Sequence, residues 1–186
     1  MNRKTALALV EFNSIAHGIA FADQMTKGGD IKLLDNYPTC PGKHVAIISG
    51  DTQAVKEALM KGLESGNDFV LEHTVIPNID PQVLNGAMGI PAASAKDIDA
   101  LGIVESYSII KTVEAADQAV KESKVLLVEM RLGKALGGKG YFIITGEIGA
   151  VTSATRKAAE FLAAETNLVA YRIIPAPSDE VKKSLF

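Results

Sequence analysis

Leu7-Ala-Leu-Val-Glu11 occurs a second time in the chain, with two changes, as Leu101-Gly-Ile-Val-Glu105. Other short motifs recur in the same order: Ala22-Asp23-Gln24 and Ala116-Asp117-Gln118, Gly42-Lys43 and Gly138-Lys139, Ile47-Ile48-Ser49-Gly50 and Ile143-Ile144-Thr145-Gly146, Ile76-Pro77 and Ile174-Pro175. The copies lie about 94 residues apart early in the chain and about 98 residues apart late, so the loops differ in length while the elements keep their order. The repeat predicts two tandem domains with the same fold.

The length of the chain agrees with two small domains. Its 186 residues divide into a first domain at 1–90, a linker at 91–99 and a second domain at 100–186. Units of this size bury only a modest core and gain stability by packing against a neighbour. A hydrophobic content of 47% with 22% charged residues is typical of a globular protein.

Charge and hydropathy argue against several classes of protein. The net charge of −3 provides no electrostatic attraction to nucleic acid or to an anionic membrane. No apolar run reaches the roughly 18 residues that a membrane-spanning helix needs. The first apolar stretch is interrupted by Glu11, which is unlike a secretory signal. Because the single cysteine cannot form an intrachain disulfide, we expect a cytosolic protein.

Periodicity and capping residues predict the elements of the first half. Ser14 and Asp51 are suitable helix N-caps, and glycines follow the expected helix ends. The predicted strands are 5–12, 31–36, 44–49 and 69–76, and the predicted helices are 14–27, 51–66 and 80–84. A loop at 37–42, with two prolines around Cys40, separates the second and third strands.

The second half repeats this order of elements. The predicted strands are 101–107, 125–130, 141–145 and 168–174, and the predicted helices are 112–122, 147–164 and a short one at the C-terminus. Each half is therefore β-α-β-β-α-β, which is typical of a ferredoxin-like α+β domain with an antiparallel sheet and two helices on one face. This layout supports many functions, so the order of elements predicts none by itself.

The repeated motifs resemble a known family. In the second half they are Ala-Leu-Gly-Ile-Val-Glu (100–105), Ala-Ala-Asp-Gln-Ala-Val-Lys (115–121), Gly-Gly-Lys-Gly-Tyr (137–141), Thr-Gly-Glu (145–147) and Ile-Ile-Pro (173–175). In the first half they are Leu-Val-Glu (9–11), Ala-Asp-Gln-Met-Thr-Lys (22–27), Pro-Gly-Lys (41–43), Ser-Gly-Asp (49–51) and Val-Ile-Pro (75–77). Both sets resemble the bacterial microcompartment shell domain, in its non-permuted element order, over nearly the whole chain.

The resemblance implies a structural role without catalysis. Tandem-domain proteins of this family form homotrimers that imitate a hexamer and tile with other shell proteins into the shell of a bacterial microcompartment in the cytoplasm. In such tiles the loop before each Gly-Lys strand surrounds the central pore, where glycines let backbones crowd around an axis. The residues that match these pore loops are Thr39, Cys40, Pro41, Gly42 and Lys43 in the first half and Leu136, Gly137 and Gly138 in the second.

Cys40 has no counterpart in the matching loop of the second half, Gly133 to Gly140. The segment Thr39–Lys43 resembles the tandem shell proteins of propanediol-utilisation compartments, in which the matching cysteine holds an iron–sulfur cluster at the pore of the trimer. One cysteine cannot build such a site, because a cluster needs several ligands. The trimer that the resemblance implies brings three thiolates to one axis, which suits one [4Fe–4S] cluster with an open corner. Such a cluster would pass electrons across the shell, with a redox partner among the cargo enzymes.

Two other interpretations of the same loop stay open. The pore can admit a small polar metabolite without any cluster, with Cys40 a bystander or a redox-sensitive gate. The chain can also be a thiol redox enzyme in which Lys43 or His44 lowers the pKa of the thiol, although no second cysteine is present to resolve an oxidised one. In the cluster interpretation, Lys43 is a candidate to offset the cluster's charge and His44 to hydrogen-bond a ligand.

Lys27 and Lys121 occupy matching positions at the end of the first helix in each half. A cation there stabilises a helix C-terminus, and the resemblance implies a further contact with the equivalent lysine of the next tile. Many shell domains carry an arginine directly after Ile-Pro, whereas this chain has Asn78 and Ala176. We therefore expect a lateral contact that is weaker or differently made. The duplicated Glu11 and Glu105 are expected to be structural.

Overall fold

The computed structural model describes residues 5–185, apart from the side chains of residues 65–67. The chain forms two compact units that divide between Ile79 and Asp80. The segment predicted as a linker, 91–99, and the short helix before it therefore group with the second unit. Hydrogen bonds account for this grouping: Ala92 N donates to Leu127 O at 2.8 Å, and Asp80 N donates to Asp117 Oδ1 at 2.9 Å.

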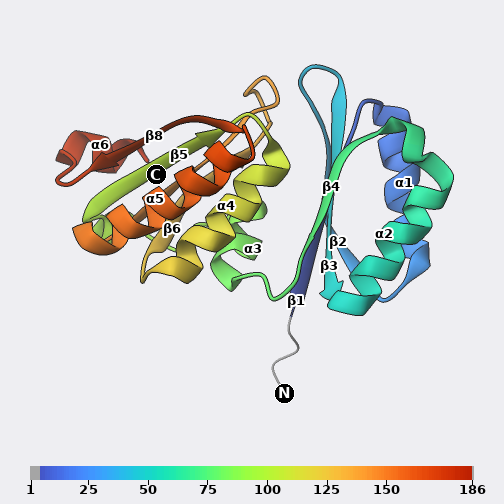
Figure 1. The fold of residues 1–186 in the computed structure, drawn as a ribbon, viewed down its shortest axis with the longest axis horizontal. Helices are drawn as coiled ribbons and strands as arrows, with labels where there is room; N and C mark the ends of the chain where they lie inside the picture. Colours follow the sequence, from blue (N-terminus) through green and yellow to red (C-terminus); the bar gives the residue numbers. More distant parts are fainter. Residues whose placement is uncertain (1–4, 186) are drawn as a thin grey trace. The chain divides into compact units, whose positions relative to one another are not determined.

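The first unit is a four-stranded antiparallel sheet in the order β2-β3-β1-β4, with two helices on one face (Figure 1). Its elements are β1 (Thr5–Phe12), α1 (Ile15–Gly28), β2 (Ile31–Thr39), β3 (Lys43–Asp51), α2 (Thr52–Gly66), a 3-10 turn η1 (Asn67–Phe69) and β4 (Val70–Ile76). The central strand β1 is buried along nearly its whole length, which explains its unbroken apolar sequence. Strand β2 lies at the edge of the sheet.

The second unit repeats this sheet in the order β6-β7-β5-β8, again with two helices on one face (Figure 1). Its elements are α3 (Pro81–Ala87), a 3-10 turn η2 (Ala95–Asp97), β5 (Ala100–Ser106), α4 (Ile109–Glu122), β6 (Leu126–Leu132), β7 (Gly140–Gly146), α5 (Ile148–Ala164), β8 (Leu168–Ile174) and α6 (Asp179–Ser184). The tandem α+β layout expected from the repeat is confirmed.

Apolar side chains between helices and sheet hold each unit together. In the first unit, alternate residues of β1 meet the two helices in one cluster that includes Ala6, Ala8, Val10, Phe12, Phe21, Ala22, Met25, Val55, Ala58 and Leu59. The rings of Phe12 and Phe21 pack edge to face with centroids 4.8 Å apart. Burying each large side chain of this kind stabilises the fold by about 2 kcal/mol.

Serine N-caps begin α1 and α4, the helices that follow the central strands β1 and β5, as the sequence predicts for Ser14. Ser14 Oγ accepts a hydrogen bond from His17 N at 3.4 Å, and Ser108 Oγ accepts one from Lys111 N at 3.1 Å. Each cap satisfies a backbone N–H that the helix itself leaves unpaired, and such a cap contributes about 1 kcal/mol. The two helices therefore start at equivalent points after the central strand.

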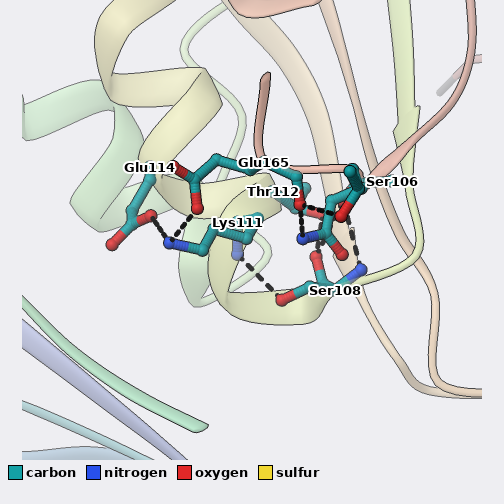
Figure 2. A network of polar contacts seen from close by, with 8 residues as sticks. Ser106, Ser108, Lys111, Thr112, Glu114 and Glu165 are labelled. Atoms are coloured by element: carbon teal, nitrogen blue, oxygen red, sulfur yellow. Dashed lines mark hydrogen bonds and ion pairs between the residues drawn. The ribbon is translucent and has the colours of Figure 1, made fainter. Parts of the chain in front are cut away.

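In the second unit this cap belongs to a larger polar network, shown in Figure 2, that involves Ser106, Ser108, Lys111, Thr112, Glu114 and Glu165. Thr112 Oγ1 donates to Ser108 O at 2.7 Å. Lys111 Nζ lies 2.9 Å from Glu114 Oε2 and 3.2 Å from Glu165 Oε2. The network ties the start of α4 to the end of β5 and to the residue that follows α5. It thereby fixes the helix beside Gly140, the first residue of β7.

Where the first helix after the central strand packs on the third strand, the two units place the large and the small residue on opposite elements. In the first unit Gly18 of α1 faces the ring of His44 on β3, and a Cβ added to Gly18 would lie 2.5 Å from His44 Cδ2. In the second unit the equivalent helix residue is Thr112 and the strand residue is Gly140, and a Cβ on Gly140 would collide with the Thr112 side chain. In the first unit the strand residue fills the space between helix and strand, and in the second unit the helix residue fills the equivalent space.

Gly18→Thr and His44→Gly should each destabilise the protein, whereas the double variant copies the second unit and should regain much of the loss. The first change overpacks the site, and the second leaves a cavity that costs about 2–4 kcal/mol. Urea unfolding at fixed protein concentration measures the coupling, which we expect to exceed about 1 kcal/mol. Gly29→Thr is the control partner for His44→Gly, because a Cβ there meets only Ala54 O, at 3.4 Å. If the losses in unfolding free energy of Gly18→Thr and His44→Gly simply add in the double variant, the two residues do not substitute for one another in this space.

Candidate pore-loop site

The loop that carries Cys40 is a tight turn of three residues between β2 and β3. Thr39 pairs with Lys43 across the two strands, and Cys40, Pro41 and Gly42 make the connection. All three are exposed, and the Cys40–Pro41 peptide bond is cis. Gly42 has φ +78°, a left-handed conformation that favours glycine. The thiol is therefore presented at the outer tip of a hairpin.

The predicted loop at 37–42 is wrong at its first half, because β2 continues through residue 39. Tyr37 pairs with Val45 and Pro38 pairs with His44. Proline is accepted because β2 is an edge strand, where a missing N–H breaks no sheet hydrogen bond if it faces outward. Burial, with nearby carboxylates, raises the pKa of Tyr37 well above its usual value. The flanks of the turn are consequently rigid sheet, and only three residues remain as loop.

Lys43 is held by a carboxylate on the neighbouring strand. Its Nζ lies 3.0 Å from Glu11 Oε1, and the Glu11 side chain is only 6% exposed. A buried carboxylate needs such a partner, because an unpaired charge inside a protein is costly. The expectation that Glu11 is structural agrees with this geometry, whereas the charge of Lys43 is already matched within the chain. Lys43 is therefore a poor candidate to offset the charge of a metal cluster.

His44 points into the helix layer. The ring packs beside Phe12 and Gly18 and is 1% exposed, and its Nε2 lies 2.6 Å from Asn36 Oδ1. Burial lowers the pKa of His44, so the ring is neutral at neutral pH and its Nε2–H donates to Asn36. This placement leaves His44 poorly suited to support a ligand at the tip of the turn.

Two buried polar atoms near the tip, Thr39 Oγ1 and His44 Nδ1, have no hydrogen-bond partner among the described residues. Among residues 5–185, Thr39 Oγ1 is buried without any hydrogen bond in the chain, although Thr39 itself directly precedes the exposed Cys40. Buried hydroxyl groups are normally paired with protein or with ordered water, so we expect a partner from outside the chain, such as a water molecule, at this one. Sequence patterns alone do not reveal such an atom, because it depends on the close pairing of β2 with β3.

The corresponding loop of the second unit, residues 133–139, is longer and differently shaped. Four of its residues have left-handed backbone: Gly133, Ala135, Gly137 and Gly138, with φ between +61° and +87°. Backbone hydrogen bonds close it, with Gly133 N donating to Lys139 O at 2.9 Å and Lys139 N donating to Leu136 O at 3.2 Å. Gly137 is exposed, Leu136 is half-buried and Gly138 is buried. The predicted loop residues are thus gathered in one compact turn that carries no thiol.

The ion pair behind the turn is duplicated. Lys139 Nζ lies 3.1 Å from Glu105 Oε1, which repeats the Lys43–Glu11 pair in the first unit. Both Lys139 and Glu105 are about 40% exposed, so the second pair is less sheltered than the first. The lysine and the glutamate of each pair recur at equivalent positions in the two halves, which is the trace that these pairs leave in the sequence. The spacing alone does not predict the contact, because Lys43 and Glu11 are 32 residues apart.

The two lysines predicted at the tile edge each pair with an aspartate one helical turn earlier. Lys27 Nζ lies 2.5 Å from Asp23 Oδ2, and Lys121 Nζ lies 2.5 Å from Asp117 Oδ2. Lys27 is the more exposed of the two, at 63% against 44%. These contacts orient both side chains along their helices.

The positions where an arginine is missing are both exposed. Asn78 has φ +52°. Asparagine tolerates this left-handed conformation better than most residues. Ala176 is also exposed and carries no polar side chain. Neither residue can reproduce the bidentate contacts of an arginine.

No single chain offers a complete metal site in its described part. Over residues 5–185, no group of three or more histidine, cysteine, aspartate or glutamate side chains could hold a metal ion. Within the same range, no helix is long and apolar enough to cross a membrane. Any cluster bound through Cys40 must therefore draw its other ligands from outside the chain.

Comparison with known proteins places both units in one family. The model of the BMC domain matches residues 6–79 and again residues 100–177. The bacterial microcompartment shell protein PduT of Citrobacter freundii is 34% identical over 181 residues, which cover 97% of each chain. The carboxysome assembly protein CcmO of Synechococcus elongatus is 28% identical over an alignment that covers 97% of this chain and 68% of the relative.

Solved structures agree with these relatives. A crystal structure of a microcompartments protein from Desulfitobacterium hafniense DCB superposes with a TM-score of 0.92, at 37% identity over 97% of this chain and 99% of the other. The fused permuted hexameric shell protein MSM0275 from the RMM microcompartment superposes with a TM-score of 0.59, at 20% identity over 86% and 82% of the two chains. The second likeness concerns the fold alone.

Proposed function

The chain belongs to the BMC-domain family of bacterial microcompartment shell proteins, and on this premise we propose that it forms a homotrimer whose central pore holds one [4Fe–4S] cluster through Cys40 of each chain. A tandem of two BMC domains is a structural shell component, and it locates the protein in a microcompartment shell. The observation that carries the finer proposal is the exposed thiol at the tip of the β2–β3 turn, which the other half of the chain lacks.

The count of domains supports threefold assembly. Three chains supply six BMC domains, which can alternate around an axis as first and second halves. The pore would then be lined alternately by the turn at 40–42 and the loop at 133–139. Closed rotational symmetry is the usual outcome for self-assembling proteins, and in a trimer it places three copies of each residue at equal distances around one axis. Other shell proteins are the partners of such a tile.

The residues present fit an iron–sulfur cluster only in this assembled form. Cysteine thiolate is the ordinary ligand of such clusters, and three thiolates leave one iron with an open position. The hairpin holds the sulfur outward, with Thr39 and Lys43 locked in the sheet on either side. Because Lys43 is paired with Glu11, the negative charge of a cluster would be balanced by groups other than Lys43.

A bound cluster would supply one-electron chemistry at the pore, so we propose electron transfer across the shell to a redox enzyme of the cargo. In this proposal the protein builds the shell and transfers electrons through it, and it catalyses no reaction itself. The competing proposal, a cluster-free pore for a small polar metabolite, is supported by the glycine-rich loop at 133–139, which has no metal ligand. The two proposals differ in the iron content of the intact trimer.

Cys40→Ser should remove the cluster and leave the trimer. Anaerobically reconstituted protein is expected to carry about four iron and four sulfide per trimer, and the variant only background levels, because serine does not replace the thiolate. Leu136→Ala, in the loop that lacks a thiol, is the matched control and should keep its iron. Mass measurement in solution checks the trimer in each case. Unchanged iron in Cys40→Ser would overturn the cluster, and an iron-free wild-type trimer would favour the metabolite pore.

We propose in addition that Lys27 and Lys121 contact neighbouring tiles. Lys27→Ala should reduce the protein recovered in sheets by about tenfold, which corresponds to the loss of about 1.4 kcal/mol per contact, without changing the mass of the trimer. Sedimentation and electron microscopy measure the sheets. Lys157→Ala, an exposed lysine on α5, is the control and should tile normally. Normal sheets from Lys27→Ala would remove this residue from the edge contact.

A further inference from the structure

The segments that follow the last strand of each half are equivalent but differently buried. Ile76-Pro77 leads into α3, and Ile174-Pro175 leads into α6. Val83 of α3 is fully buried, whereas its counterpart in α6, Val181, is 40% exposed. No residue of α6 is buried, although Leu185 directly after it packs on the apolar cluster of its own unit. The Val181 face of α6 therefore lacks the cover that α3 has.

Helix α3 is covered because it packs against α4 and the edge strand β6. Asp80 N, at the start of α3, donates to Asp117 Oδ1 at 2.9 Å. The Gln82 side chain bridges the edge strand, since its Oε1 accepts from Leu127 N at 3.0 Å and its Nε2 donates to Val125 O at 3.4 Å. Gly86 sits so close to Leu127 that a Cβ would collide with the leucine side chain. Leu127 is fully buried as a result.

The first unit presents the equivalent surface, and no other described part of the chain covers its aspartate and leucine. The residues that correspond to Asp117, Val125 and Leu127 are Asp23, Ile31 and Leu33. The register is the same in both sheets: Leu33 pairs with Ile48 as Leu127 pairs with Ile144, and both edge strands shift register directly afterwards. Leu33 is nevertheless 40% exposed and the Asp23 side chain 53% exposed.

We propose that α6 of one copy docks on the α1–β2 surface of the next copy, formed by Asp23, Ile31 and Leu33. The inference rests on the proposed trimer and names the contact that closes it. Val181 takes the place of Val83, the backbone N–H of Ser178 donates to Asp23, and Glu180 accepts from Leu33 N as Gln82 accepts from Leu127 N. The contact is head to tail, because α6 follows the second half and the surface it meets lies on the first half. Such a contact closes into a ring when its rotation fits.

Two differences between α3 and α6 predict that the proposed α6 contact between chains, called the α6 seam below, is looser than the α3 contact within the chain. Glu180 can accept the hydrogen bond from Leu33 N, but as a carboxylate it cannot donate to Ile31 O as an amide can. Ser184 stands where α3 has Gly86, so its Cβ keeps the helix slightly farther from Leu33. Dissociation of the trimer should therefore begin at α6 while the α3 contact persists.

A disulfide between Leu33→Cys and Ser184→Cys, in a Cys40→Ser background, tests the seam. A Cβ at the equivalent α3 position would lie 3.6 Å from Leu127 Cγ, which is within reach of a disulfide. Oxidation should give covalent dimers and trimers and no longer species. Leu33→Cys with Lys183→Cys, one position round the helix, is the control and should cross-link at least about tenfold less. Both original positions are exposed, so folding is unaffected.

The outcomes separate this contact from the trimer itself. A trimer by mass that forms no Leu33→Cys–Ser184→Cys bond between chains would overturn the α6 seam and leave the proposed function standing. Cross-linked chains longer than three would overturn the closed ring. Protein that never exceeds one chain in solution would contradict the proposed trimer before the seam is considered.

Discussion

The antiparallel pairing of β2 with β3 is the constraint on which the candidate site depends. It runs from Ile31 opposite Gly50 to Thr39 opposite Lys43, so the chain has only three residues in which to reverse. Cys40 is consequently held at the tip of a rigid hairpin. A longer, flexible loop would leave the position of the sulfur undefined. Behind the tip, the sheltered Lys43–Glu11 pair fixes the end of β3 against β1. A metal site shared between chains needs this rigidity, because each chain contributes only one ligand.

The two halves share one scaffold and differ at several equivalent places. The turn at 40–42 is short and carries a thiol, whereas the loop at 133–139 is long, rich in glycine and closed by its own backbone hydrogen bonds. The strands behind them diverged too, since His44 and Gly18 fill the space that Gly140 and Thr112 fill in the other half. The helix tails α3 and α6 differ in the same sense, one covered within the chain and one exposed. All three differences distinguish the two halves of the chain, as the proposed trimer with two kinds of domain would need.

Much of the fold could be predicted from the sequence, because caps and apolar periodicity act locally. Ser14 begins α1, Asp51 Oδ1 accepts from Gln53 N at the start of α2, and β8 has the predicted bounds. The end of β2 could not be predicted, because the pairing of Tyr37 and Pro38 depends on their place at a sheet edge. The partner of Lys43 and the grouping of α3 with the second unit also depend on contacts between distant residues. Cys40 stood out by its lack of a counterpart, but its exposure at the tip required the structure.

In the proposed trimer, three Cys40 thiolates hold one cluster together. Co-expression of tagged wild-type chains with untagged Cys40→Ser chains gives trimers that can be separated by the number of tags. We expect a full complement of about four iron in trimers with three wild-type chains and little in those with two or one, because removing a thiolate from an already open cluster destabilises it. Iron that falls in proportion to the number of wild-type chains would contradict a shared cluster and would assign iron to single chains.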